Sequence, residues 1–329
     1  MAFLGIDTSN YRTSFCVIDE HFQIVHEQNP LLPVAEGELG LQQSKAVFEH
    51  LRQWSEMLKA MPRVQQIKAI GVSIKPRPMD HSYMPVFRVG EVLAQTLAHF
   101  LSVPLYSTSH QEGHIAAGEF TASESLDDQF IAVHLSGGTS EVLLCTRKEA
   151  GYSIEKLGGT LDLHAGQFVD RVGVALNLPF PSGPSLERLA QTSEDDPELN
   201  GVLKQSKNSF TISSFCKGVD FSFSGPTTAA LRLVQQSSAA DYPHIARAVE
   251  RNIAKTIEKS LLTAMKQTGI KDILLVGGVA SNVYITTILK KRLEHRAVKG
   301  RLILANPVYA TDNAFGVACI AGTHFNISR

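Results

Sequence analysis

The chain has 329 residues, of which 43% are hydrophobic and 19% are charged, and its formal net charge is −1 at pH 7. This length is too great for one compact core and is typical of two domains, while the composition is that of an ordinary globular protein. The near-zero net charge excludes a uniformly basic nucleic-acid-binding surface, so any contact with RNA must come from local patches or from partner proteins.

The cysteines and the N-terminus bear on the compartment. Cys16, Cys145, Cys216 and Cys319 are widely spaced and form no C-x-x-C pair. They indicate neither a disulfide framework nor a cysteine-based zinc site. Residues 2–7 lack the basic and apolar regions of a signal peptide, and no apolar run approaches the length of a membrane span. We therefore expect a cytoplasmic protein that makes no membrane contact.

The first half of the chain alternates strand and helix patterns. Residues 3–19 predict two strands joined by a polar turn, and 22–26 predict a third strand. A helix is expected over 41–61. Its apolar positions are Val47, Leu51, Trp54 and Leu58. A strand, a helix, a strand and a helix then follow at 67–74, 86–101, 103–106 and from His110 onward.

The second half repeats this order. Residues 130–144 again predict a strand, a small-residue turn and a strand, and 152–157 predict a third strand. Helices are expected at 169–176, 185–191, 227–235 and 246–267. The chain continues with a strand at 272–276, a helix from Asn282, a strand at 301–305 and a final helix from Asp312.

Two copies of a β-β-β-α-β-α-β-α pattern predict an α/β protein with helices on both faces of largely parallel sheets. This is the duplicated, two-lobed actin, hexokinase and Hsp70 (ASKHA) architecture. We place the N-terminal lobe at 1–126, completed by the C-terminal helix 312–329, and the C-terminal lobe at 127–311. In this architecture a nucleotide lies in the cleft between the lobes, and its phosphates contact the hairpin turns.

A histidine pair is the most specific chemical feature of the first half. His110 and His114 are four residues apart, so on a helix they lie one turn apart on the same face and can share one metal ion. The alternative is two histidines that fall at this spacing by chance. A zinc protease would have Glu directly after the first histidine, but that position holds Gln111, and Glu112 lies about 100° further round.

A third metal ligand must come from elsewhere, and Asp312 is the best candidate. It lies where the strand at 301–305 gives way, through a loop containing Pro307, to an apolar helix. The simpler interpretation is that Thr311 or Asp312 caps that helix. Both roles are compatible.

Two small-residue turns are candidates for nucleotide binding. The turn Ser136, Gly137, Gly138 and Thr139 can present backbone N–H groups and hydroxyls to an anion, although Gly-Gly is also common in ordinary hairpins. The turn that begins with Gly277 and Gly278 and ends at Asn282 follows an apolar strand and opens a helix. The chain has neither a P-loop nor a Rossmann G-x-G-x-x-G motif.

Together these motifs resemble the TsaD family, the tRNA N6-adenosine threonylcarbamoyltransferases once described as O-sialoglycoprotein endopeptidases. The resemblance covers nearly the whole chain in co-linear order. It rests on the His110 and His114 pair and on residues 4–9, 135–138, 166–170, 180–184, 220–225, 277–282 and 311–313.

The resemblance implies a chemistry and its residues. An iron or zinc ion would be held by His110, His114 and Asp312. The ligand would be an adenine nucleotide, namely threonylcarbamoyl-AMP, AMP or ATP. Its pocket would comprise Leu135, Ser136, Gly137, Gly138, Thr139, Asp170, Gly183, Gly277, Gly278 and Asn282. The acceptor would be N6 of adenosine in a tRNA anticodon loop, and TsaB-like and TsaE-like proteins would be partners.

The chain departs from the family pattern near the expected site. Residues 10–12 are Asn-Tyr-Arg instead of Cys-Asp-Glu, residues 76–78 are Pro-Arg-Pro instead of Gly-Pro-Gly, and Thr139 replaces a histidine. Gln167 replaces a glutamate and Thr227 a lysine. Two alternatives therefore stay open: a divergent paralogue that modifies another acceptor, or a non-catalytic partner subunit. We expect Arg12 and Arg77 at the mouth of the cleft, where they would favour a phosphate-bearing acceptor.

Overall fold

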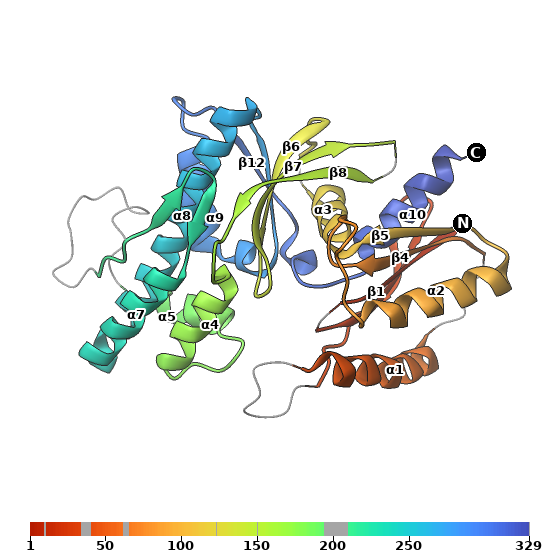
Figure 1. Cartoon of the computed structure of the whole chain (residues 1–329), viewed down its shortest axis with the longest axis horizontal. Coiled ribbons are helices and arrows are strands. Elements are labelled where there is room, and N and C mark those ends of the chain that lie inside the picture. The colour runs from red at the N-terminus through yellow and green to blue at the C-terminus, as the bar shows by residue number, and fades with distance from the viewer. Residues whose placement is uncertain are drawn as a thin grey trace. The chain divides into compact units, whose positions relative to one another are not determined.

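The computed structural model describes residues 1–9, 11–33, 41–61, 66–122, 124–149, 151–193 and 210–328. These residues form two compact units (Figure 1). Unit 1 comprises Met1–Ser125, Thr146–Ser153 and Val308–Arg329, and unit 2 comprises Leu126–Cys145 and Ile154–Pro307. The segment Thr146–Ser153 thus groups with unit 1, whereas the sequence predicts one lobe over 127–311; the division into lobes stays a prediction.

Unit 1 is built on a five-stranded sheet. Its strands are β1 (Ala2–Thr8), β2 (Thr13–Asp19), β3 (Ile24–Gln28), β4 (Ile67–Lys75) and β5 (Leu105–Ser109). They lie in the order β3-β2-β1-β4-β5. The first three strands pair antiparallel, whereas β1, β4 and β5 pair parallel. The predicted hairpins at one edge and the parallel strands beside them are confirmed.

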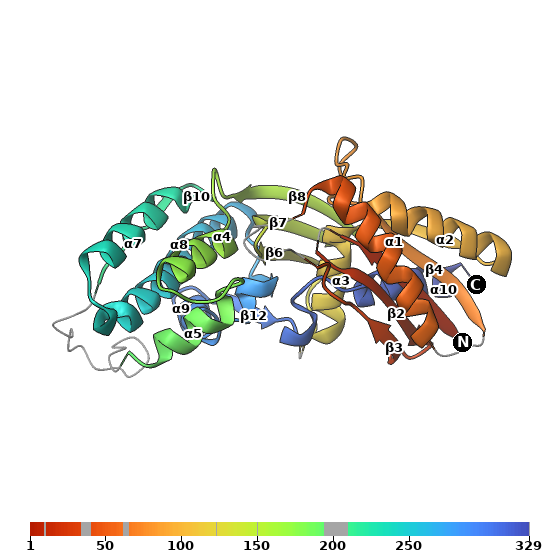
Figure 2. The ribbon, with the colours of Figure 1, turned by 90° about the horizontal axis from the view of Figure 1, so that it is seen from below.

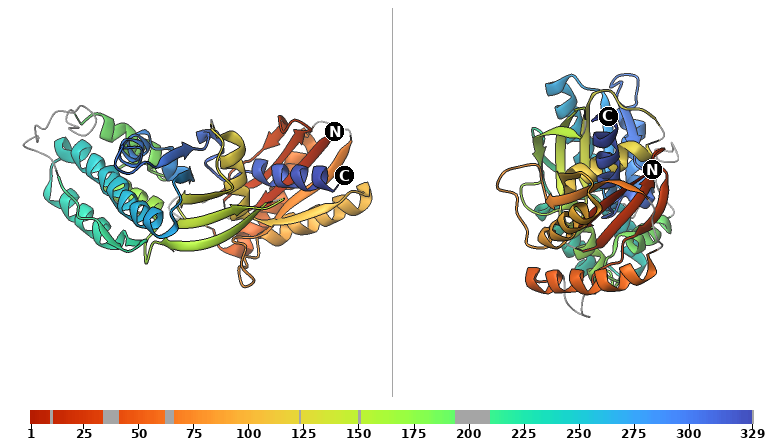
Figure 3. Two further views of the ribbon diagram at one scale, coloured as in Figure 1. Left: turned by 90° about the horizontal axis from the view of Figure 1, so that it is seen from above. Right: turned by 90° about the vertical axis from the view of Figure 1, so that its right-hand side faces the viewer.

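Residues of β1 alternate between the two faces of this sheet. Leu4 and Ile6 pack with helices α1 (Gln43–Ala60) and α2 (Phe87–Leu101). Phe3 packs instead with α3 (His110–Thr121) and α10 (Phe315–Ile327), on the other face (Figures 2 and 3). Asp7 has the same parity as Phe3, so β1 presents its carboxylate on the side of α3 and α10.

Only some of the apolar positions of α1 face the core. Trp54 is buried and stacks on Phe15 with ring centroids 5.7 Å apart, but Leu51 and Leu58 are 57% and 51% exposed. His50 and Met57 face the core in their place. Helical spacing alone does not separate these two sets, because two apolar stripes lie side by side on this helix and the docking of Trp54 selects between them.

Glycines let α10 approach the sheet and α3 very closely. A Cβ atom on Gly5 would lie 2.3 Å from the carbonyl oxygen of Ala314, and one on Gly71 would lie 2.5 Å from that of Val317. A Cβ atom on Gly316 would lie 1.9 Å from the carbonyl oxygen of Gly113. The segment that enters α10 is therefore held against β1 and α3 because these positions carry no side chain.

Unit 2 repeats the sheet of unit 1. Its strands are β6 (Gln129–Leu135), β7 (Ser140–Arg147), β8 (Tyr152–Gly159), β11 (Asp272–Val276) and β12 (Arg301–Leu304). Their order is β12-β11-β6-β7-β8. Read from β8 to β12, the strands of this sheet follow the order third, second, first, fourth and fifth, which is also the order from β3 to β5 in unit 1. This duplication confirms the predicted α/β architecture.

Helices pack on the sheet of unit 2 around one apolar core that includes Ile131, Val133 and Leu135 of β6. The α-helices are α4 (Ala165–Ala175), α5 (Gly183–Gln191), α7 (Ser224–Gln236), α8 (Tyr242–Thr268) and α9 (Val283–Leu293). Short 3-10 helices of this unit are η1 (Ala239–Asp241) and η2 (Gly278–Ser281), and η3 (Pro307–Tyr309) spans the boundary between the two units. A hairpin of β9 (Phe215–Lys217) and β10 (Asp220–Ser222) was not predicted, because three-residue strands carry no periodicity.

None of the helices in the described ranges is both long enough and apolar enough to cross a membrane.

Candidate functional site

Helix α3 begins with a capping box that positions the two histidines. The hydroxyl of Ser109 accepts a hydrogen bond from the backbone N–H of Glu112 (3.2 Å), and the Glu112 carboxylate accepts one from the backbone N–H of Ser109 (2.9 Å). These bonds satisfy two donors at the helix start. Glu112 is thus a capping residue, and His110 and His114 occupy the first turn and a half of the helix.

Asp312 lies in the turn before α10. The helix begins only at Phe315, and the side chain of Asn313 accepts a hydrogen bond from the backbone N–H of Phe315 (3.0 Å). The helix therefore starts three residues later than predicted. Because Asn313 supports this helix start, the Asp312 carboxylate remains available for other contacts.

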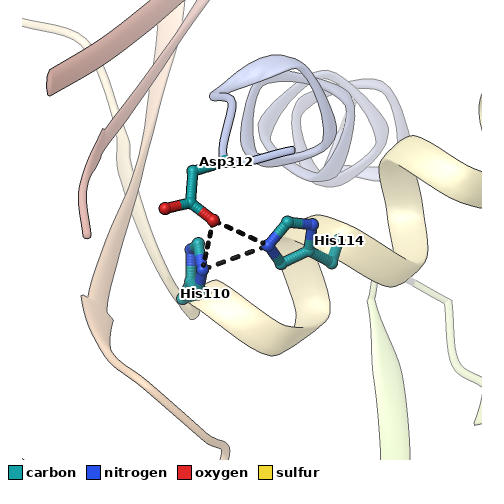
Figure 4. A group of neighbouring side chains, drawn as sticks. All are labelled: His110, His114 and Asp312. Carbon is teal, nitrogen blue, oxygen red and sulfur yellow. Dashed lines mark hydrogen bonds and ion pairs between the residues drawn. The ribbon is translucent and has the colours of Figure 1, made fainter. Parts of the chain in front are cut away.

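The side chains of His110, His114 and Asp312 point toward one another (Figure 4). The two Nε2 atoms are 3.1 Å apart, and each lies 3.4 Å from Oδ1 of Asp312. His114 is buried, whereas His110 and Asp312 are partly exposed. The structure therefore gathers two imidazoles and one carboxylate from distant parts of the sequence.

A second layer of side chains orients this triad. Asp7 is fully buried, and its Oδ2 atom lies 2.9 Å from Nδ1 of His110 and accepts a hydrogen bond from the hydroxyl of Ser73. The hydroxyl of Ser9 donates to Oδ2 of Asp312 (3.0 Å), which leaves Oδ1 facing the histidines. Asp7, Ser9 and Ser73 were not predicted as site residues. The one available signal was a charged residue inside the apolar pattern of β1.

Electrostatics favour positive charge at the triad. Burial alone would lower the pKa of His110, but the carboxylates of Asp7 and Asp312 outweigh burial and raise this pKa to about 10. Burial acts to raise the pKa of Asp312, but its contacts with His110 and His114 hold it well below its usual value. The same negative charges that favour a proton on His110 would favour a metal cation in its place.

The donor set fits a divalent metal ion. Ligand atoms bound tetrahedrally at about 2.0–2.2 Å from one ion lie about 3.3–3.6 Å from each other. The observed separations of 3.1–3.4 Å are close to these values. A hydrogen bond from Nδ1–H of His110 to Asp7 leaves the lone pair of Nε2 directed at the triad. Three protein ligands are the number found in catalytic zinc sites, which keep one position open.

The turn between β6 and β7 lies at the carboxyl end of β6, and its donors are partly occupied. The backbone N–H groups of Gly138 and Thr139 donate to the hydroxyl of Ser136 (3.3 and 3.0 Å). A Cβ atom on Gly137 or Gly138 would meet no atom within 4 Å. Gly138 thus faces open space, whereas α4 packs against Gly137, since a Cβ atom on Gly166 would lie 2.7 Å from the backbone nitrogen of Gly137. A ligand at the N–H groups of Gly138 and Thr139 would have to replace the Ser136 hydroxyl as the acceptor.

The turn after β11 lies beside the end of β6. Gly277 has a φ of +100°, and a Cβ atom there would lie 2.3 Å from the carbonyl oxygen of Leu135. Only glycine fits this position. Gly278 faces open space. The two predicted turns therefore meet at the carboxyl ends of neighbouring parallel strands, which is where α/β sheets bind ligands.

The remaining predicted nucleotide residues make structural contacts. Oδ1 of Asp170 accepts a hydrogen bond from the backbone N–H of Ser182 (2.7 Å), which ties α4 to the loop before Gly183. Asn282 caps α9 through the backbone N–H of Ile285 (2.9 Å) and donates to Glu250 (2.6 Å). Both polar atoms of the Asn282 side chain thus have protein partners.

Three positions that depart from the family pattern also make local hydrogen bonds. Gln167 accepts a hydrogen bond from the backbone N–H of His164 (3.3 Å) at the start of α4. The hydroxyl of Thr227 donates to the carbonyl of Phe223 (2.7 Å) in α7, and Arg12 donates to the carbonyl of Asn29. Asn10 lies outside the described residues.

Solved structures with a similar fold are known. HypF from T. kodakarensis has a TM-score of 0.58 at 16% identity, with 99% of this chain and 48% of that chain covered. The (R)-2-hydroxyglutaryl-CoA dehydratase component A from Acidaminococcus fermentans has a TM-score of 0.55 at 15% identity, with 99% of both chains covered. At these identities the likeness concerns the fold alone, and it confirms the ASKHA class.

Sequence comparison identifies the family. The TsaD model, described as tRNA N6-adenosine threonylcarbamoyltransferase, matches residues 57–319. A protein of that description from Nostoc punctiforme is 30% identical over 334 residues, covering 98% of this chain and 91% of its own length. Another, from Persephonella marina, is 30% identical over 327 residues, covering 97% and 88%. The chain therefore belongs to the TsaD family of transferases.

Proposed function

We propose that this chain transfers the threonylcarbamoyl group from threonylcarbamoyl-AMP to N6 of an adenosine in a tRNA anticodon loop. We propose one divalent ion, iron or zinc, as its cofactor, held by His110, His114 and Asp312. Family membership supports the reaction, and the convergence of these three side chains supports the ion. An unpaired anticodon loop exposes a base at low unstacking cost, which makes it an accessible acceptor.

In this reaction the N6 amine attacks the carbamoyl carbon of the adenylate. A C–N bond forms, the C–O bond to the phosphate breaks, AMP leaves with the electron pair and the amine loses a proton. A bound divalent ion supplies Lewis acidity toward a carbonyl or phosphoryl oxygen. Asp7 orients His110, and Ser9 orients Asp312, so that the ligand atoms hold one arrangement throughout.

We propose that the adenylate contacts the two turns of unit 2. The residues are Leu135, Ser136, Gly137, Gly138, Thr139, Asp170, Gly183, Gly277, Gly278 and Asn282. The open space next to Gly138 and Gly278 supports this assignment, since a phosphate can approach the backbone there. Rotation of the Ser136 side chain about its Cα–Cβ bond would move Oγ away and release the N–H groups of Gly138 and Thr139 for a phosphate oxygen.

TsaB-like and TsaE-like proteins are proposed as partners on the family resemblance.

The test is a transfer assay with nucleoside mass spectrometry. The metal-loaded protein is incubated with threonylcarbamoyl-AMP and unmodified tRNA, alone and with TsaB-like and TsaE-like proteins. Asp312→Ala removes one proposed metal ligand, and His99→Ala, on the exposed surface of α2, is the matched control. We expect modified adenosine from the unmutated protein and His99→Ala, but not from Asp312→Ala.

Other outcomes point to the alternatives. Transfer to a small-molecule or protein amine, with unmodified tRNA recovered, would indicate another acceptor. Bound adenylate with no transfer under any condition would indicate a non-catalytic subunit.

A further inference from the structure

One corner of unit 2 concentrates positive charge. Residues 290–301 contain six Lys or Arg residues and one Glu, a formal net charge of +5, in a chain whose total is −1. The rest of the chain therefore carries −6 by difference. A local excess of this size produces a positive potential that the bulk charge conceals.

The fold joins this segment to the end of α8. A Cβ atom on Gly300 would lie 2.9 Å from Cε of Met265 in α8 and 3.0 Å from the carbonyl oxygen of Leu293 in α9. Lys271 reaches the carbonyl of Val298 (3.5 Å). The ends of α8 and α9 and the start of β12 are thus neighbours (Figure 1). We define the basic corner as the exposed residues Lys266, Lys271, Lys290, Lys291, Arg292, Arg296 and Lys299.

Helix ends explain only part of this cluster. Lysine and arginine in the last turn of a helix complement its dipole, which accounts for Lys266 in α8 and residues 290–292 in α9. Lys271, Arg296 and Lys299 lie beyond the helix ends. Lys299 also has a φ of 59°, a conformation in which glycine or asparagine is usual. Local backbone structure does not require positive charge at these three positions.

Acidic side chains are outnumbered in this segment, because Glu294 is the one acidic residue between 290 and 301. Glu294 lies 3.9 Å from Lys290. Asp272 pairs with Arg301 through Oδ1 and Nε (2.8 Å), so we exclude Arg301 from the corner. No large apolar side chain between 290 and 301 is exposed. A surface that binds lipid membranes combines basic and inserted apolar residues, so this composition favours a soluble polyanion.

We propose that the basic corner binds the phosphate backbone of the tRNA acceptor. The inference rests on the proposed function for the identity of the RNA. The corner lies at the amino ends of β11 and β12, opposite the carboxyl ends that carry Leu135 and Gly277. It therefore anchors the RNA away from the proposed adenylate residues. Backbone contacts of this kind set affinity and position without reading sequence.

The test compares two triple variants of the full chain with the same change in charge. One is Lys271→Gln, Arg296→Gln and Lys299→Gln in the corner. The control is Lys217→Gln, Arg232→Gln and Lys255→Gln, at exposed positions on β9, α7 and the middle of α8. Binding to fluorescent unmodified tRNA is measured by anisotropy from 50 to about 300 mM salt. Phosphatidylserine vesicles and polyglutamate are the other probes.

We expect the corner variant to bind tRNA at least tenfold more weakly than the control. The magnitude of its slope of log affinity against log salt should fall by about 0.7–0.9 for each lost phosphate contact, a decrease of about 2–3 for three contacts. Equal affinity of the two variants would overturn the proposal. So would a loss confined to vesicles or polyglutamate, or the absence of tRNA binding by the unmutated protein at low salt. If the corner variant loses binding while the unmutated protein binds tRNA but modifies no adenosine, only the proposed function fails.

Discussion

The first strands of the two sheets, β1 and β6, have equal length and similar apolar patterns, yet they end in different chemistry. Each has seven residues, so Phe3 corresponds to Phe130, Gly5 to Ala132 and Asp7 to His134. In β1 the glycine admits α10 and the aspartate orients His110. Strand β6 runs into a glycine turn in which a Cβ atom on Gly138 would meet no atom within 4 Å.

This difference shows how a duplicated frame acquires two roles. In each sheet the first and fourth strands are parallel neighbours, so their carboxyl ends lie side by side at the same edge of the sheet. Buried carboxylate and imidazole groups at this edge in unit 1 form a candidate cation site. Small residues at the same edge in unit 2 form a candidate site for backbone contacts to an anion.

The largest expected effect is on the metal content of unit 1. His114→Ala or Asp312→Ala removes one of three ligands, so bound iron or zinc should fall from about one ion per chain to less than a tenth. His99→Ala is the control and should keep the full content. Elemental analysis after gel filtration measures the ratio. Full metal content in both triad variants would place the ion elsewhere.

The next effect concerns the layer behind the ligands. Asp7→Asn weakens the partner of His110 Nδ1, and metal affinity should fall about 10- to 100-fold. Asp80→Asn changes the same charge at an exposed position of unit 1 and should leave affinity unchanged. Competition with a chelating dye gives the dissociation constants. Equal constants for the two variants would show that Asp7 does not support the ligand.

Two single substitutions at the equivalent positions Gly5 and Ala132 test whether the close packing of α10 on β1 supports the metal site. Gly5→Ala places a Cβ atom 2.3 Å from the carbonyl oxygen of Ala314, so α10 must shift. It should cost about 1–3 kcal/mol of unfolding free energy and lower metal affinity. Ala132→Gly should cost only about 0.5–1 kcal/mol and leave metal affinity intact. Urea unfolding and metal titration measure both. If Gly5→Ala had the same unfolding free energy as the unmutated protein, the close approach of α10 to β1 would not be required for stability.

The turn of unit 2 should respond through nucleotide affinity alone. Gly138→Val puts a side chain into the space where a phosphate would approach, so affinity for adenine nucleotides should fall about tenfold. Because a Cβ atom at Gly138 meets no atom within 4 Å, stability should change little. Calorimetric titration and thermal unfolding check the two statements. Unchanged affinity would move the nucleotide to other residues.

The last effect is a pH dependence of the stability of unit 1. His50 is buried, with Nδ1 2.8 Å from the hydroxyl of Thr13, and burial lowers its pKa to about 4. In the unfolded chain the His50 imidazole takes up a proton near pH 6.5, whereas in the folded protein it stays neutral down to about pH 4. The contribution of neutral His50 to the unfolding free energy is therefore complete above pH 6.5 and is lost as the pH falls toward 4. From pH 7 to 5, the unfolding free energy of His50→Asn should fall about 2 kcal/mol less than that of the unmutated protein. Urea unfolding at both pH values measures this difference, and a difference that does not change with pH would contradict the prediction.

Local sequence determined the elements and the histidine pair. Most strands and helices were predicted within a few residues, because alternation and helical spacing are properties of neighbouring residues. The β11 bounds, Asp272–Val276, match the prediction in full. That His110 and His114 lie on the same face of α3 likewise follows from helix geometry, because the capping box sets the start of the helix at His110.

Contacts between distant segments decided the rest. The burial of Trp54 in place of Leu51 and Leu58 depends on its stacking on Phe15 of β2. The roles of Asp7 and Ser9 depend on the parity of β1 and on where α3 and α10 dock. Asp312 reaches the histidines because Gly5 and Gly316 let α10 press against β1 and α3. A sequence pattern predicts on which face of its own helix or strand a side chain lies. It does not predict what packs against that face, because that depends on contacts between elements far apart in the chain.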